Sequence, residues 1–192
     1  GRYDLIADLR GNFQSIWVAW KNLPKYRVDR GTIRLRNKLA GGHPHEVITN
    51  FQIIESLLSQ EPQKIDLHLY PSEQAKVKAL AFVNQNQLGN FAVLHMGARR
   101  ALRRWPISQF VALCAYLKQE KNLNIVFAGD KSDLPLIADA QAQLNFATYK
   151  AANELDLMEF AALLEHAALF VGNESGPLHI AAAMQTAAVG LF

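Results

Sequence analysis

The sequence predicts an α/β protein whose second part, residues 71–192, forms a doubly wound parallel sheet. Short segments that are apolar throughout alternate with helical segments, as expected for strands that are buried on both faces of a parallel sheet. The composition, with 50% apolar and 19% charged residues, excludes a disordered, collagen-like or coiled-coil chain. The longest uncharged, near-apolar run lies between Glu174 and Phe192, but polar residues interrupt it, so no segment is predicted to be a transmembrane helix of roughly 20 residues. Charges at Arg2, Asp4, Asp8 and Arg10 exclude a signal peptide.

Residues 1–70 predict the later part of a second α/β domain. An apolar strand over Tyr3–Asp8 is followed by a helix over Phe13–Trp20. The basic segment Lys21–Lys38 comes next and is expected to form a loop or a sheet edge. The remaining expected elements are a helix over Glu46–Leu58 and a short alternating run over Ile65–Tyr70.

Five strands and five helices are expected in residues 71–192. The strands are Phe91–Met96, Asn124–Ala128, Phe146–Tyr149, Leu169–Gly172 and Ala187–Phe192. The helices, predicted from the 3.6-residue spacing of apolar side chains, are Ser72–Gln85, Ile107–Gln119, one that ends near Gln143, Leu157–His166 and Pro177–Met184. Ser72 is the expected N-cap of the first helix, with Val77, Leu80 and Ala81 on its apolar face. Both ends of the chain lie close to strands, so we expect it to be a fragment of a longer protein.

The net charge of +3 comes from the first 70 residues. Between Lys21 and Lys38 there are seven bases and one acid. Such a surface attracts phosphates or an anionic membrane, although each base equally suits an ordinary solvated face. The small net charge, and the lack of aromatic residues interleaved with the bases, disfavour a nucleic-acid-binding module. The single cysteine, Cys114, excludes a disulfide framework and a multi-cysteine metal site and fits a reducing cytoplasm.

Three loops that follow predicted strands carry polar residues at the edge where open α/β sheets bind ligands. The first loop holds four arginines, which are Arg99, Arg100, Arg103 and Arg104. Gly97 lets the backbone approach a ligand, and guanidinium groups pair with phosphate oxygens. We therefore expect at least one of these arginines to contact a phosphate ester. The alternative is a basic surface loop in which Trp105 packs at the helix start.

The second loop, Gly129–Asp133, contains a carboxylate with two interpretations. Asp133 can accept hydrogen bonds from both hydroxyls of a ribose. It can equally stabilise the start of the following helix through the helix dipole. Both interpretations stay open at the level of sequence.

The third loop, Asn173–His179, combines an anion site with a carboxylate. Pro177 marks the start of a helix, and the N–H groups of Ser175, Gly176 and Leu178 are expected to be free to bind an anion. Glu174 is placed to accept hydrogen bonds from hydroxyls, and His179 lies one turn into the helix. This pairing suits a sugar that is joined to a phosphate.

The run Asn173–Ala183 resembles the signature of the ADP-heptose:lipopolysaccharide heptosyltransferases (glycosyltransferase family 9). Their pattern is an acid, then Ser or Thr, Gly, Pro, an apolar residue, His and an alanine-rich helix. His95–Ala98 with Arg103–Pro106 is similar to the family's Gly-Ala loop followed by Lys-x-Trp-Pro. Tyr3–Asn12 with Ser15 resembles its Tyr-Asp-x-x-x-Asp-x-x-Gly strand and helix. The resemblance spans nearly the whole chain in the right order.

The resemblance implies a GT-B fold, in which two Rossmann-like, doubly wound domains face each other. Residues 1–70 would be the rear of the N-terminal, acceptor-side domain, here incomplete, and residues 71–192 most of the donor-binding domain. The implied reaction is transfer of heptose from ADP-heptose, with inversion, to the lipopolysaccharide inner core. The acceptor would be a lipid-linked phosphorylated saccharide at the cytoplasmic face of the inner membrane. We expect no cofactor, and the absence of an Asp-x-Asp motif gives no support to a metal bound in that way.

The resemblance also assigns donor-binding roles by position. Gly97 and Arg104 belong to the arginine loop, and Arg103 stands where the family has a phosphate-binding lysine. Glu174 stands at the family's donor-side aspartate. The remaining assignments are Ser175, Gly176 and His179 to the diphosphate loop, Asp133 to the ribose and Leu155 to the adenine pocket. The catalytic base is expected upstream of the chain; Asp8 is the nearest substitute, with a buried supporting role as the other interpretation.

Several positions depart from the family pattern. Arginine replaces lysine at Arg103, glutamate replaces aspartate at Glu174, and Gln185–Ala187 replaces a usual Gly-x-Pro. Ala151 and Ala152 stand where a glycine is common. These changes leave open a divergent or non-catalytic nucleotide-sugar-binding protein of the same fold that uses another donor. A nicotinamide dehydrogenase is disfavoured, because no Gly-x-Gly-x-x-Gly follows any predicted strand.

Overall fold

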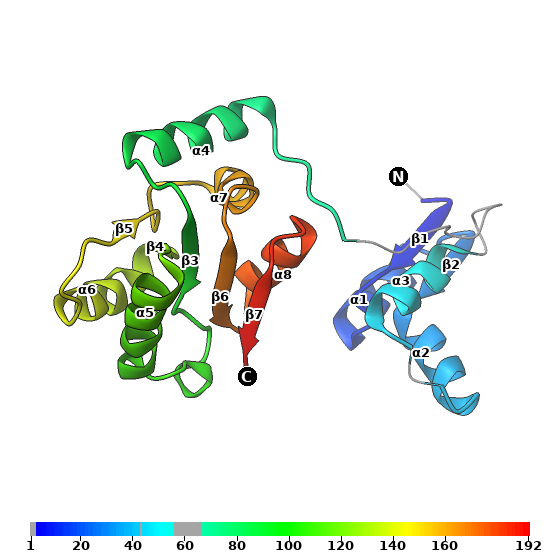
Figure 1. Cartoon of the computed structure of the whole chain (residues 1–192). Coiled ribbons are helices and arrows are strands. Elements are labelled where there is room, and N and C mark those ends of the chain that lie inside the picture. The colour runs from blue at the N-terminus through cyan, green and yellow to red at the C-terminus, as the bar shows by residue number, and fades with distance from the viewer. Residues whose placement is uncertain (1–2, 43, 56–66) are drawn as a thin grey trace. The chain divides into compact units, whose positions relative to one another are not determined.

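The computed structural model describes residues 3–42, 44–55 and 67–192. The chain divides into two compact units, Gly1–Ile65 and Asp66–Phe192, which are drawn in Figure 1. This division lies slightly before the boundary that we expected after residue 70. The acceptor-side and donor-side roles given to the two parts stay predictions.

The first unit is built on two short parallel strands, β1 (Leu5–Asp8) and β2 (Tyr26–Asp29). Its helices are α1 (Phe13–Lys21), α2 (Arg30–Leu39) and α3 (Glu46–Glu55). Strand β1 and helices α1 and α3 were expected, although the predicted end of α3 at Leu58, like the start of the run at Ile65, lies outside the described residues. Residues 67–70, the rest of that run, form neither strand nor helix.

The expectation of a loop or edge over the basic segment was incomplete, because the segment contains β2 and α2. Asp29 starts this helix: its carboxylate accepts hydrogen bonds from the N–H of Thr32 at 2.9 Å and from the Thr32 hydroxyl. An N-cap of this kind satisfies backbone donors that the first helical turn leaves free. Helix α2 buries none of its residues, so no apolar stripe marked it in the sequence.

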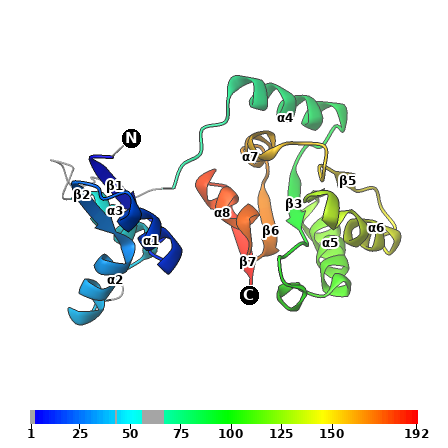
Figure 2. The ribbon, with the colours of Figure 1, turned by 180° about the vertical axis from the view of Figure 1, so that it is seen from behind.

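The second unit contains five parallel strands in the order β5-β4-β3-β6-β7. Their bounds are β3 (Phe91–His95), β4 (Asn124–Ala128), β5 (Tyr149–Lys150), β6 (Leu169–Asn173) and β7 (Ala188–Leu191). The chain runs outward from β3 to β5 and then returns to place β6 on the other side of β3, which Figure 2 shows from behind. This confirms the doubly wound sheet. Strand β5 lies later than expected, where Tyr149 and Lys150 pair with Val126 and Phe127.

Both faces of this sheet are covered by helices. The helices are α4 (Glu73–Gln85), α5 (Ile107–Lys121), α6 (Leu134–Ala142), α7 (Leu157–Leu164) and α8 (Gly176–Ala183), with single 3-10 turns η1 (Ala101–Arg103) and η2 (Lys131–Asp133). Phe91 and Val93 of β3 pack in one core with residues of α4, α7 and α8. Ala92 and Leu94 pack in the other with residues of α5 and α6. Every residue of β3 is buried, which explains its unbroken apolar sequence.

The predicted apolar face of α4 was wrong. Its buried residues are Ala75, Ala79 and Phe82, whereas Val77 and Leu80 are exposed. Two alanines on the inner face let α4 approach α7 closely, and this fit, not hydrophobicity alone, decides which face is buried. The predicted cap is confirmed, since the Ser72 hydroxyl accepts a hydrogen bond from the Ala75 N–H at 3.2 Å.

Candidate functional site

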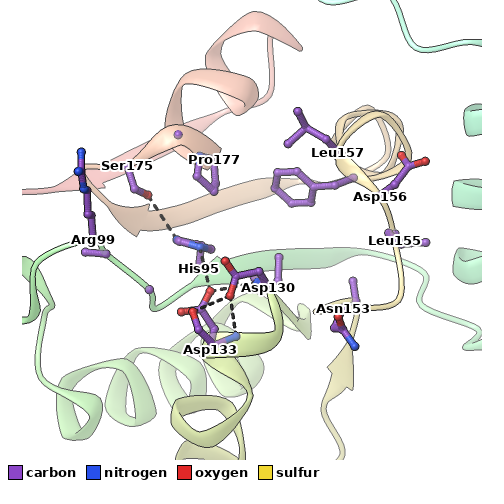
Figure 3. A pocket seen from close by; sticks show the side chains of 18 of the residues that line it. His95, Arg99, Asp130, Asp133, Asn153, Leu155, Asp156, Leu157, Ser175 and Pro177 are labelled. Atoms are coloured by element: carbon purple, nitrogen blue, oxygen red, sulfur yellow. Dashed lines mark hydrogen bonds and ion pairs between the residues drawn. The ribbon is translucent and has the colours of Figure 1, made fainter.

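The second unit contains a cavity of about 680 Å³ beyond the carboxyl ends of β3, β4 and β6 (Figure 3). Its walls come from four places in the sequence. These are the loop after β3 (with Gly97, Arg99 and Arg104), the loop after β4 (with Gly129, Asp130 and Asp133), the segment before α7 (with Asn153, Leu155 and Asp156) and the start of α8 (with Ser175, Gly176 and Pro177). The three loops that the sequence singled out therefore meet at one cavity. A fourth wall, before α7, had been marked only by Leu155.

The arginines of the first loop divide into two groups. Arg99 and Arg104 line the cavity, and the Arg104 Nε donates a hydrogen bond to the Ala98 carbonyl at 3.3 Å. Arg103 instead forms an ion pair with Glu174, with Nη1 and Oε2 2.7 Å apart. Figure 3 shows Arg99 on the same side of the cavity as Ser175. Two guanidinium groups thus belong to the cavity, and that of Arg99 lies on the side of the cavity where α8 begins.

The start of α8 has the features of an anion site. Within the part of the chain that the structure describes, no hydrogen bond engages the N–H groups of Ser175 and Gly176. The Leu178 N–H is different, because it donates to the Ser175 carbonyl at 3.2 Å; the expectation that it is free was wrong. A Cβ atom placed on Gly176 would meet nothing within 4 Å. His179 is exposed, and neither it nor Glu174 is among the residues that line the cavity.

Asp133 is buried beneath the cavity and does not stand at its rim. Its carboxylate accepts a hydrogen bond from the Asp130 N–H at 3.1 Å and packs against the backbone of Gly97 and Gly129. A Cβ atom on Gly129 would lie 2.8 Å from the Asp133 Cβ, and Gly129 has a φ of +154°, so both the space and the backbone require glycine. The geometry favours the helix-start interpretation of Asp133, and Asp130 takes the exposed position in this loop.

His95 joins two walls of the cavity, and the sequence had marked it only as part of a motif. The ring is buried, with Nδ1 3.4 Å from the Ser175 hydroxyl oxygen and Nε2 3.6 Å from Asp133 Oδ2. Figure 3 shows Ser175, His95 and Asp133 in a row. The hydrogen bond with His95 holds the pKa of Asp133 below its usual value, against burial, with further help from the Asp130 N–H and the charges of His95 and Arg104.

Asn173 fixes the arginine loop to the end of β6, and sequence reasoning gave it no role of its own. Its side chain is fully buried. Nδ2 donates to the carbonyls of Met96 (2.8 Å) and Gly97 (3.3 Å), and Oδ1 accepts from the Trp105 N–H at 2.9 Å. One amide thus holds both ends of the loop that carries the arginines.

The wall before α7 is apolar at Leu155 and polar around it. Leu155 lines the cavity, while its assignment to an adenine pocket stays a prediction, and Asn153 beside it has a left-handed backbone with a φ of +60°. Asp156 caps α7 by accepting from the N–H groups of Met158 and Glu159. Buried Glu159 in turn accepts from the Asp156 N–H at 2.9 Å and pairs with Lys78 of α4. This network holds the Leu155 wall in place.

Asp8, the candidate base within this chain, has its carboxylate engaged in hydrogen bonds to the loop that follows it. Oδ1 accepts from the N–H groups of Arg10 and Gly11 at 3.0 Å, and Oδ2 accepts from the Ser15 hydroxyl at 2.8 Å. Burial raises the pKa of Asp8, but these hydrogen bonds and the charge of Arg27 outweigh it and hold the pKa below its usual value. A carboxylate stabilised in its ionised form in this way is a poor proton acceptor, so the geometry supports the buried, supporting interpretation.

The basic segment of the first unit is partly neutralised. Arg30 and Arg34 both pair with Glu46, and Arg27 pairs with Asp29 at 3.3 Å. Lys21 and Lys25 lie over the rings of Trp17 and Tyr26. Among the described residues, no helix is both long and apolar enough to cross a membrane, and no three metal-binding side chains come together.

Comparison with known proteins gives this cavity its context. The profile of glycosyltransferase family 9 (heptosyltransferase) matches residues 1–192. The chain belongs to glycosyltransferase family 9. The predicted family and its α/β GT-B fold are both confirmed.

Individual relatives agree with this assignment. The chain is 32% identical over 105 residues to lipopolysaccharide heptosyltransferase 3 of Escherichia coli. These 105 residues are 54% of this chain and 31% of that protein. It is similar to the solved family 9 glycosyltransferase of Veillonella parvula, with a TM-score of 0.80, 20% identity, and coverage of 99% of this chain and 57% of that one. It is also similar to E. coli heptosyltransferase WaaC in complex with ADP-2-deoxy-2-fluoro heptose, with a TM-score of 0.69, 20% identity, and coverage of 99% and 61%. The chain thus spans about three fifths of these solved structures and about a third of the curated relative.

Proposed function

We propose that the chain carries the nucleotide-sugar site of a heptosyltransferase, which transfers heptose from ADP-heptose to the lipopolysaccharide inner core with inversion. The observation that supports this most is the cavity itself. It combines Arg99 and the N–H groups of Ser175 and Gly176 at one side with the apolar Leu155 at another, and Arg104 also lines it. A nucleoside diphosphate has matching chemistry, since it is anionic at one end and has a flat base at the other. WaaC, a relative of similar fold, binds an ADP-heptose analogue.

In this proposal the cations and the helix start act on the leaving group. When the bond between the sugar and the diphosphate breaks, negative charge builds up on the departing oxygen. Arg99, Arg104 and the N-terminus of α8 would stabilise that charge, because fixed donors and positive groups favour the transition state over the bound substrate. The proposal assigns no base to Asp8, whose oxygens are already engaged.

Arg103 and Glu174 would act at the sugar end. They pair with each other in this structure, and both are about half exposed, so the pair costs little to open. Donor binding would release Glu174 to accept hydroxyl hydrogen bonds and release Arg103 toward the diphosphate. This role keeps the positional assignments that the family resemblance gives, although neither residue lines the cavity here.

The acceptor and the location are also proposals. A lipid-linked phosphorylated saccharide at the cytoplasmic face of the inner membrane would be the acceptor, and the membrane contact would be peripheral. In this proposal the exposed lysines of the first unit, Lys21, Lys25 and Lys38, meet that surface. Three of its arginines are already paired with acidic side chains.

The experiment that tests the donor site is calorimetric titration of the chain with ADP, ADP-heptose, UDP and NAD. Gly176→Ala is the most specific variant, because its Cβ atom meets nothing in the protein but would stand where a diphosphate approaches the helix start. We expect the melting temperature to stay the same and the affinity for ADP to fall about tenfold or more. Arg104→Ala should weaken binding similarly, whereas Arg100→Ala, in the same loop but outside the cavity lining, is the matched control.

Three outcomes would distinguish this proposal from its alternatives. Preference for UDP would retain the site and replace the donor. Binding that is unchanged in Gly176→Ala would place the diphosphate elsewhere and contradict the proposal. Binding without any transfer to a lipopolysaccharide acceptor, measured in the full-length protein, would favour a non-catalytic nucleotide-sugar-binding protein.

A further inference from the structure

A chain of three polar side chains lies at the base of the cavity, and each comes from a different part of the sheet. Ser175 follows β6, His95 ends β3, and Asp133 ends the turn η2 after β4. His95 and Asp133 are buried, and all three residues line the cavity. None of the roles derived so far requires His95, so its place between the other two calls for an explanation.

The hydrogen bonds of Ser175 limit where the protons of His95 can lie. The serine hydroxyl has one proton and two acceptors within reach, the Asn173 carbonyl at 3.0 Å and His95 Nδ1 at 3.4 Å. When that proton is donated to the nearer carbonyl, the contact with Nδ1 has to be donated by the imidazole. A neutral ring with its proton on Nδ1 would turn the lone pair of Nε2 toward the Asp133 carboxylate 3.6 Å away. A ring protonated on both nitrogens satisfies both neighbours.

The position of the imidazole is fixed by its surroundings. The Asp133 carboxylate is held against the backbone of Gly97 and Gly129 and cannot move away from the ring. The other charged groups around the cavity are Arg99 and Arg104 from the loop after β3, Asp130 from the loop after β4 and Asp156 before α7. Helix α8 places the Ser175 hydroxyl against the ring, and its own titratable group, His179, is exposed on the helix.

We propose that His95 is a positioning residue of the donor site. In its doubly protonated form it pairs with Asp133 and donates from Nδ1 to the Ser175 oxygen. The Ser175 proton is then free to turn from the Asn173 carbonyl toward a phosphate oxygen without leaving the serine oxygen unsupported. The identity of the ligand rests on the proposed function, but the arrangement of the three side chains does not.

The consequence is a donor affinity that depends on pH. When the imidazole loses its proton, it can no longer donate to Ser175 and also face Asp133. The serine proton is then drawn to Nδ1 and is lost to the ligand. Affinity for a diphosphate should fall as the pH rises through the range in which histidine deprotonates.

The test is calorimetric titration with ADP-glucose between pH 5.5 and 8.5. The diphosphate of this probe is esterified at both ends, so its charge is constant over that range. We expect the affinity of the unmodified chain to fall about tenfold across the range, the scale of one hydrogen bond to a charged partner. His95→Asn should bind at the weaker, high-pH level throughout. His166→Asn, the same change on an exposed histidine, should behave like the unmodified chain.

Other results would overturn the proposal. An unmodified chain whose binding does not change with pH would do so, as would His95→Asn that keeps the full dependence. Loss of the dependence in His179→Asn alone would move the effect to that residue. If no form binds ADP-glucose or ADP while all remain folded, the proposed function fails instead.

A second measurement does not depend on a variant that folds. Nitrogen-15 NMR of the imidazole in the unmodified chain reports which ring nitrogens carry protons. We expect both nitrogens of His95 to be protonated in the form that binds ADP-glucose most tightly. A neutral ring with its only proton on Nε2 would mean that Ser175 donates to Nδ1, and it would overturn the proposal.

Discussion

The two units of the chain differ in how completely their sheets are covered, and the difference decides what their buried polar groups do. The five strands of the second unit are packed between two helical layers, whereas the described part of the first unit has two strands. Among its described residues the first unit buries only Asp8, Ala19, Thr49 and Ile53.

In the first unit Asp8 closes its own loop, with partners two to seven residues away. In the second unit the buried polar residues His95, Asp133 and Asn173 bring together loops that are far apart in sequence. A covered sheet gives such groups a rigid support, and this is the condition under which loops can hold a ligand site.

The largest effect that would sharpen this comparison is expected from truncating matched phenylalanines. Phe127 is fully buried and Phe13 is 83% exposed. Phe127→Ala should lower the free energy of unfolding of the second unit by about 3–5 kcal/mol, and Phe13→Ala should change that of the first by less than about 0.5 kcal/mol. Urea unfolding followed by circular dichroism measures both. Equal losses would show that α1 is covered in solution and would remove the contrast.

The next effect is expected at the asparagine that clamps the arginine loop. Asn173→Leu keeps the size of the side chain but leaves the Trp105 N–H and the Met96 carbonyl without their partner, which should cost about 2–3 kcal/mol. Asn37→Leu, in the first unit, removes a single hydrogen bond to Gln52 and should cost less than about 1 kcal/mol. Hydrogen exchange at Trp105 provides the local measurement. An amide as protected as before would mean that the loop does not need the clamp.

Acid should weaken both units, each through its own carboxylate. The folded-state pKa values of Asp8 and Asp133 lie below the usual value of 3.8. Each carboxylate therefore contributes stability that is complete above about pH 4 and is lost as the pH falls through the folded-state pKa. Thermal unfolding between pH 2 and 5 measures how steeply the melting temperature of each unit falls with pH. Asp133→Asn should make this fall shallower in the second unit, and Asp8→Asn should do so in the first. A fall as steep as before in either variant would assign the acid sensitivity to another group.

The smallest effects are expected from the ion pairs. Glu159 is buried and pairs with Lys78, whereas Glu46 is half exposed and pairs with Arg30 and Arg34. Glu159→Gln should lower the melting temperature of the second unit by about 2–4 °C, and Glu46→Gln should have almost no effect because water and salt screen exposed pairs. A larger drop in melting temperature for Glu46→Gln than for Glu159→Gln would contradict the expectation that the ion pair of the second unit contributes more to stability.

How well the sequence predicted each unit follows from the same difference. Continuous apolar strands such as Phe91–His95 are unmistakable because both faces are buried. Helix α2 has no buried residue and gives no such signal, so it was not predicted. On α4 the sequence contains two interleaved apolar rows, and the smaller residues, Ala75 and Ala79, were selected by close packing against α7.

The site was predicted as loops but not as a network. The sequence identified the three loops, and their meeting follows from the parallel sheet. It could not assign Arg103 to an ion pair with Glu174 or Asn173 to three hydrogen bonds, because these depend on side-chain geometry across the sheet. One signal was present, since His95 and Asn173 are polar residues that end otherwise apolar strands, and β3 and β6 are neighbours.

The strand order also has a consequence for how the protein acquires its site during folding. The hydrogen bonds that join Asn173 to Met96 and Ser175 to His95 connect residues 77 and 80 positions apart. Contacts between residues so far apart in sequence close large loops. The conformational entropy of the intervening chain is therefore lost before any favourable energy of strand pairing is gained. An intermediate that had paired only β3 and β4 would possess half of the cavity wall and no helix start to bind an anion. A diphosphate ligand would therefore bind only chains that have completed the return to β6, so its binding would report that this part of folding is complete.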